Sequence, residues 1–120
     1  MLPRPRQGLF TGLIIDARGL QVKGALSPKI LRPDGKVVWD PIQMNRFLPR
    51  EQGFVLYRSS LKAAMRREIR AGENPLVLRA IGCQGWFRAN VVVSDEDADL
   101  ILRENAKARF LERSAVIFVI

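Results

Sequence analysis

The sequence contains no histidine and a single cysteine, and both facts exclude chemistry. Without histidine there is no Ser-His-Asp or Cys-His catalysis and no imidazole-ligated metal site. Cys83 cannot form an intramolecular disulfide, and beside Ile81 and Trp86 we expect it to be a buried, inert thiol. The glycines match neither a phosphate-binding loop nor a dinucleotide-binding fingerprint, and we expect no cofactor.

Long apolar runs are also missing. No run approaches the roughly 20 residues that span a bilayer, and the longest is Ala115–Ile120. The first residues lack the apolar core of a signal peptide. Alternating proline and arginine at positions 3–6 are typical of an extended linker, so we expect residues 1–8 to be a linker or boundary and residues 9–120 to form one domain.

Acidic residues are few relative to basic ones. Twelve Asp and Glu oppose twenty Lys and Arg in 120 residues, which gives a net charge of +8. Residues 1–60 carry ten basic and four acidic residues, so most of the excess lies in this half. Such a balance fits a soluble basic surface, and it also favours contact with phosphate, anionic lipid or an acidic protein.

The residue pattern of the first half of the chain predicts mainly strands. Residues 9–16 are apolar and β-prone, and Asp16-Ala17-Arg18-Gly19 ends them with turn residues. Pro33-Asp34-Gly35 between 29–32 and 36–39 predicts a hairpin. We expect a loop over 40–52, with room for a short helical turn, and a strand over 53–57.

The second half alternates strands and helices. Ser59 or Ser60 can cap a helix with Leu61, Met65 and Ile69 on one face, and Gly72 and Pro75 end it. We expect strands over 76–81 and 87–93 with a loop over 82–85 between them. Ser94 and three following carboxylates predict the start of a second helix. Ala115–Ile120 is predicted to be a central strand, buried on both faces.

This order predicts an α+β fold. A hairpin and two β-α-β units form one mixed sheet of about six to seven strands, and two helices pack mainly on one face.

Two groups of residues invite a functional interpretation. Asp16 ends an apolar strand, where a buried carboxylate needs a partner; Arg18 can pair with it, or the carboxylate can close a turn over the Arg18 and Gly19 amides. Four aromatic side chains lie near arginines and could stack on bases, although core packing or hairpin ends account for most of them. They are Trp39, Tyr57, Trp86 and Phe87.

Several of these segments together resemble a known family. They are residues 11–20 (TGLIIDARGL), 25–30 (ALSPKI), 34–39 (DGKVVW), 53–57, 74–80, 91–94, 97–98 and 116–120. Over about residues 9–120 the chain is similar to an uncharacterised domain found toward the C-terminal end of bacterial secreted and lipoprotein-like envelope proteins. More remotely it resembles domains of the flagellar assembly protein T.

The resemblance implies a non-enzymatic envelope or periplasmic domain that binds another protein, and it brings no catalytic residue. It singles out Asp16, Arg18, Gly19 and Pro28 as a possible partner contact. An open sheet edge is a second possible contact. The alternative is a basic cytoplasmic module that binds nucleic acid through six arginines, namely Arg46, Arg50, Arg58, Arg66, Arg67 and Arg70.

Overall fold

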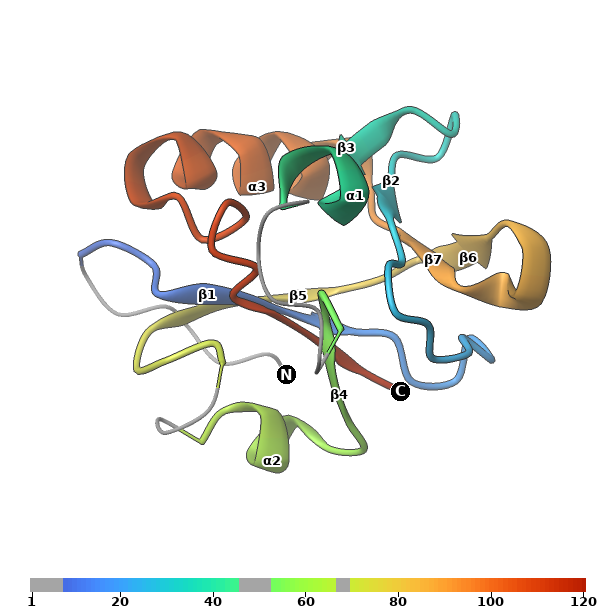
Figure 1. The fold of residues 1–120 in the computed structure, drawn as a ribbon, viewed down its shortest axis with the longest axis horizontal. Coiled ribbons are helices and arrows are strands. Elements are labelled where there is room, and N and C mark those ends of the chain that lie inside the picture. Colours follow the sequence, from blue (N-terminus) through green and yellow to red (C-terminus); the bar gives the residue numbers. More distant parts are fainter. Residues whose placement is uncertain (1–7, 46–52, 67–69) are drawn as a thin grey trace.

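The computed structural model describes residues 8–45, 53–66 and 70–120. It is an α+β fold with two four-stranded sheets (Figure 1). The strands are β1 Gly12–Asp16, β2 Ile30–Leu31, β3 Val37–Trp39, β4 Leu56–Arg58, β5 Pro75–Arg79, β6 Gly82–Gln84, β7 Asn90–Val92 and β8 Val116–Val119. The helices are α1 Pro41–Met44, α2 Leu61–Ala64 and α3 Asp95–Ala108, with a 3-10 turn at Trp86–Arg88.

The first sheet is parallel and has the strand order β4-β8-β1-β5. Its two central strands are the two apolar runs at the start and end of the domain. Every residue of β1 and of β8 is buried. The prediction that the closing strand is central and buried on both faces is therefore confirmed.

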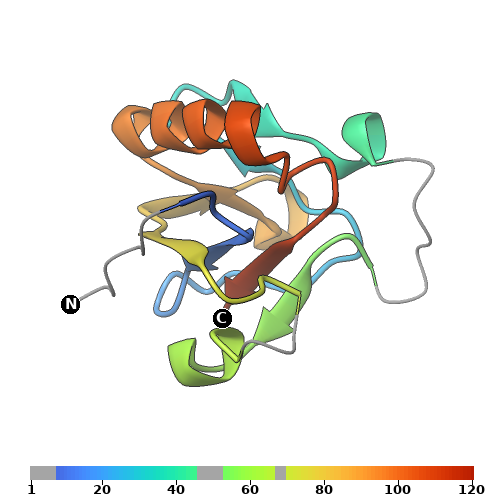
Figure 2. The same cartoon turned by 90° about the vertical axis from the view of Figure 1, so that its left-hand side faces the viewer.

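The two faces of this sheet have separate cores, because successive strand residues point to opposite sides. Leu13, Ile15 and Phe118 pack with Ile101 of α3 on one face. On the other face Ile14 and Ile117 belong to a cluster that includes Ala64 of α2. Helices α3 and α2 thus cover opposite faces, as the two views show (Figures 1 and 2).

This arrangement corrects the prediction that both helices pack mainly on one face. The physical reason lies in β1 and β8, which carry apolar side chains on both of their faces. A strand of this kind needs cover from both sides, so one helix on each face is the lower-energy solution.

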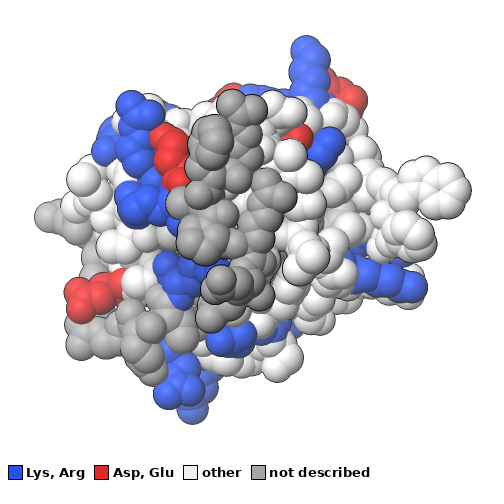
Figure 3. Space-filling model, in the orientation of Figure 1, with Lys and Arg blue, Asp and Glu red and all other residues white. Residues whose placement is uncertain are grey.

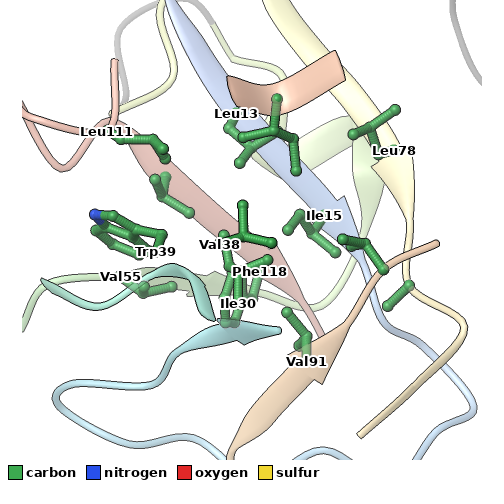
Figure 4. Close-up of a cluster of buried hydrophobic side chains, with 14 of the residues drawn as sticks. Leu13, Ile15, Ile30, Val38, Trp39, Val55, Leu78, Val91, Leu111 and Phe118 are labelled. Atoms are coloured by element: carbon green, nitrogen blue, oxygen red, sulfur yellow. The ribbon is translucent and has the colours of Figure 1, made fainter. Parts of the chain in front are cut away.

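The second sheet has the order β3-β2-β7-β6 and packs on the same face as α3. Leu13, Ile15 and Phe118 from the first sheet meet Trp39 and Val91 from the second in one cluster (Figure 4). The predicted hairpin is confirmed, since β2 pairs antiparallel with β3.

The predicted single mixed sheet is wrong, because the strands divide between two sheets. β7 pairs with β2 and β6, whereas β8 pairs with β1 and β4, so β7-α3-β8 joins the two sheets instead of forming a β-α-β unit. β4 and β5 share a sheet but lie at its opposite edges. The sequence pattern identifies strands but contains little information on which distant strand each one pairs with.

Three side chains cap the helices. The side-chain oxygens of Asp40, Ser60 and Ser94 accept hydrogen bonds from the N–H groups of Ile42, Ala63 and Asp97 at 3.0–3.1 Å. The predicted caps at Ser60 and Ser94 are thus confirmed. The predicted length of the first of these helices is wrong, since α2 ends at Ala64 and not near Gly72, and Ile69 lies outside the described residues. Among the described helices, none has the length and apolar character to cross a membrane.

Gly12 packs closely against backbone atoms of neighbouring segments. A Cβ at this position would lie 2.5 Å from the Ala71 Cα and 2.8 Å from the Ala115 carbonyl oxygen, and backbone atoms cannot move aside cheaply. We expect Gly12→Ala to lower the free energy of unfolding by about 2 kcal/mol or more. Gly82→Ala is the matched control, because a Cβ there meets only the Val92 Cβ, at 3.9 Å.

Urea denaturation of both variants measures the difference. Equal stability of the two variants would contradict the close packing at Gly12.

Candidate functional site

The carboxyl ends of the parallel strands form one edge of the first sheet. Register places Arg58, Val119, Asp16 and Arg79 side by side across β4, β8, β1 and β5. Two long connections leave this edge, the loop of residues 17–29 after β1 and the β6–β7 hairpin after β5. Loops at the carboxyl ends of parallel strands commonly build binding sites, and the predicted contact residues Asp16, Arg18 and Gly19 lie at this edge.

Asp16 is buried and fully occupied. Its carboxylate accepts hydrogen bonds from Arg18 Nε and Nη2, both at 2.9 Å, and from the Arg18 backbone N–H at 3.2 Å. Arg79 Nη2 lies 3.6 Å from Asp16 Oδ2. The Arg18 side-chain hydrogen bonds are the main cause that lowers the pKa of Asp16, against the opposing effect of burial. The Asp16 carboxylate therefore pairs with the Arg18 side chain and also closes a turn over the Arg18 amide, whereas the described residues show no hydrogen bond to it from the second amide predicted for this turn, that of Gly19.

The four residues predicted as a partner contact divide into two kinds. Asp16 and Pro28 are buried, so neither offers surface to a partner. Arg18 and Gly19 are exposed, with 44% of the Arg18 side chain accessible. The predicted role of this motif in partner contact stays a prediction, and only its Arg18-Gly19 part faces outward.

The six arginines of the nucleic-acid alternative are described only in part. Arg58 donates to the Tyr57 carbonyl at 2.7 Å, and Arg70 donates to the Gly53 carbonyl at 3.4 Å. Burial, and then the positive charge of Arg58, lowers the pKa of Arg70. Arg66 is exposed. The others lie outside the described residues: Arg46, Arg50 and Arg67.

The acidic residues at the start of α3 have a structural role. Asp95 and Asp99 accept hydrogen bonds from Arg32 at 3.0 and 2.7 Å, which ties the β2–β3 turn to the helix. In the part of the chain that the structure describes, no three His, Cys, Asp or Glu side chains gather where they could hold a metal ion.

Sequence reasoning missed the β6–β7 hairpin. The predicted loop over 82–85 contains strand β6, and the predicted strand over 87–93 begins only at Asn90. The tip between them places Trp86 and Phe87 in solvent, 88% and 77% exposed, with ring centroids 6.1 Å apart. Gly85, the last residue of the predicted loop, has φ +93° and begins the tip, so the turn lies after β6 and not before residue 86 as predicted.

Arg88 fastens this tip to the loop after β1. Its Nη2 and Nε donate to the carbonyls of Leu20 and Gln21 at 3.0 and 3.3 Å. In return the Lys23 N–H donates to the Arg88 carbonyl at 3.1 Å. The two connections that leave the carboxyl edge therefore support one another.

The first sheet ends in two edge strands that differ in cover. The segment 24–26 lies along β4: the Phe54 N–H donates to the Leu26 carbonyl at 2.9 Å, and the Tyr57 hydroxyl accepts from the Ala25 N–H at 2.9 Å. An open, mostly apolar pocket of about 340 Å³ lies between these two segments. At the opposite edge, β5 pairs with β1 alone among the described strands.

Comparison with known proteins identifies one family. Residues 12–120 match the family model described as Treponema pallidum Tp0624, second domain. That description names neither the flagellar assembly protein T nor a lipoprotein. The search of curated proteins finds no match.

The Asp16 ion pair predicts a pH-dependent stability. Because the folded-state pKa of Asp16 lies below its ordinary value of 3.8, its contribution is complete above that pH and is lost as the pH falls through the lowered pKa. We expect Asp16→Asn to lower the free energy of unfolding by about 2 kcal/mol at pH 7 and by progressively less below pH ~3.

Urea denaturation at both pH values checks this, with Glu96→Gln, an exposed residue of α3, as the control. If the free energy of unfolding lost in Asp16→Asn does not change with pH, the ionised Asp16 is not the origin of the stabilisation.

Proposed function

The chain belongs to the family of the second domain of Treponema pallidum Tp0624, and we propose that it is a non-enzymatic bacterial envelope domain that binds another protein. The family description places the reference domain inside a longer protein. A domain of that kind suits a role in holding or assembling partners. The partner contact that we propose is the outer edge of β5, which pairs with no other described strand than β1.

The observation that carries this proposal is the outer side of β5, with which no strand of the described residues pairs. The Ala80 N–H donates to the Asp16 carbonyl at 2.9 Å. In a parallel pair this pattern directs the backbone groups of Leu76 and Leu78 toward β1, and it directs those of Val77 and Arg79 away from the sheet. Two N–H groups and, with that of Pro75, three C=O groups therefore line the outer side of β5.

An extended segment of a partner can complete these hydrogen bonds. Addition of a strand to an exposed edge is a common mode of peptide recognition, in which backbone bonds supply the affinity. The side chains of Leu76, Val77 and Leu78 are already buried in the two cores, so the edge is rigid before a partner arrives. A rigid edge loses little conformational entropy on binding.

The other edges are less suited to this role. The segment 24–26 covers one side of the β4 region, and β3 and β6 of the second sheet have only three residues each. β5 has five residues. Pro75 has no N–H at its outward position, so pairing is expected over the Val77–Arg79 part of the strand.

Features of the sequence support a role without catalysis. There is no histidine to act as a general base, and Asp16 is held in an ion pair with Arg18. Cys83, the single cysteine, is partly buried and not fully buried as predicted, and its Sγ donates to the Leu20 carbonyl at 3.4 Å.

Two substitutions at one position test the β5 edge. Arg79→Ala and Arg79→Pro both remove the guanidinium group, but only proline also removes the outward N–H. With a photocrosslinking residue at position 81, which is 56% exposed in the wild type, we expect capture of a discrete protein in the native cells. Capture should persist in Arg79→Ala and fall about tenfold in Arg79→Pro, since one hydrogen bond is lost and the ring obstructs pairing.

A product of twice the chain mass would identify the partner as a second copy of the chain. Equal capture by the alanine and proline variants would rule out the edge as the contact.

The envelope location is tested separately. We expect the endogenous polypeptide in the envelope fraction of the native cells, with its intact mass showing the exported form. Recovery in the cytoplasm would contradict this location, and binding of nucleic acid through the arginines around Arg58 and Arg70 would become the function to test.

A further inference from the structure

We propose that the tip of the β6–β7 hairpin inserts into the headgroup region of a membrane rich in anionic phospholipid. The aromatic tip, residues Gly85–Arg88, is a surface separate from the β5 edge. The inference therefore does not depend on the proposed protein contact.

The exposure of the aromatic tip is unusual within this molecule. The protein buries its other tryptophan, Trp39, to 1% exposure and gives the indole N–H a partner in Asn45 at 3.0 Å. Trp86 and Phe87 instead stand in contact with each other and almost wholly in water. Tryptophan and phenylalanine are residue types that favour the boundary between headgroups and acyl chains.

The charge around the tip is of one sign. The two connected segments near the tip contain four cations and no carboxylate. They are residues 17–29 and 80–93. Lys29 pairs with Asp40 and Arg18 pairs with Asp16, whereas Lys23 and Arg88 are exposed beside the tip. Figure 3 shows uncharged side chains projecting at the right-hand edge of the surface, with basic side chains just below them. This arrangement is complementary to an anionic lipid surface.

The backbone holds the rings outward. Phe87 and Arg88 have φ values of +64° and +54°, which non-glycine residues seldom adopt, and Gly85 has +93°. The hydrogen bonds of Arg88 to the carbonyls of Leu20 and Gln21 maintain this conformation. Because the rings are already in place, insertion would require little further ordering of the loop.

The shape of the tip favours lipid over a folded protein. The hairpin extends away from the rest of the chain (Figure 1), so the rings stand on a projection and not within a broad flat surface. A stable protein interface buries about 800 Å² on each partner around a central anchor. A lipid headgroup layer needs no such complementary surface and closes around an inserted side chain.

The test uses the full chain and vesicles of phosphatidylglycerol mixed with phosphatidylcholine, compared with phosphatidylcholine alone. Tryptophan emission should shift to shorter wavelength only with the anionic vesicles, and Trp86 is the source because Trp39 is already buried. Cosedimentation should show at least about tenfold tighter binding to the anionic vesicles, and added salt should weaken it.

Variants separate insertion from simple charge attraction. The double variant Trp86→Ser with Phe87→Ser should lose roughly tenfold or more in vesicle affinity. Leu102→Ser, which removes a 40% exposed side chain on α3, should bind like the wild type. Unchanged Trp39 emission confirms that the double variant is folded.

Three results would overturn the proposal. One is an absence of binding to anionic vesicles, and another is equal binding by the wild type and the double variant, which would indicate charge attraction alone. The third is tip-dependent binding to a single-stranded oligonucleotide without vesicle binding, which would assign the rings to base stacking.

Discussion

The complete burial of β1 is the constraint on which the rest of the structure depends. All five residues from Gly12 to Asp16 are covered, so β1 needs a strand on each side and a packed layer on each face. β5 and β8 supply the hydrogen bonds, α2 covers one face, and α3 with the second sheet covers the other. Gly12 has no space even for a Cβ, which shows how closely these layers meet.

The same strand determines where polar chemistry can occur. β1 ends in a carboxylate that would be costly to bury alone, and Arg18 and Arg79 compensate it at the carboxyl edge of the sheet. Beyond this point the chain forms the loop of residues 17–29, and beyond β5 it forms the hairpin that carries Trp86 and Phe87. The ion pair thus stabilises the base from which both connections extend, and the hydrogen bonds of Arg88 join them again farther out.

The molecule offers two surfaces of different character. The outer side of β5 presents backbone donors and acceptors with side chains already packed, which suits recognition of an extended chain. The aromatic tip presents two apolar rings beside Lys23 and Arg88, which suits a soft anionic surface. These surfaces lie on successive elements, because β5 leads through Ala80 and Ile81 directly into β6.

Local features were predictable from the sequence because they depend on neighbours along the chain. The Pro33-Asp34-Gly35 hairpin, the Ser94 cap and the buried closing strand follow from turn chemistry, capping and hydrophobicity, and Arg18 lies close enough in sequence to pair with Asp16. The division into two sheets, the position of β5 at the edge of the described first sheet and the projection of Trp86 and Phe87 depend on pairing between distant segments. Only the tertiary structure decided these features, since the sequence pattern of an aromatic pair is the same whether the pair packs in a core or lies on a hairpin tip.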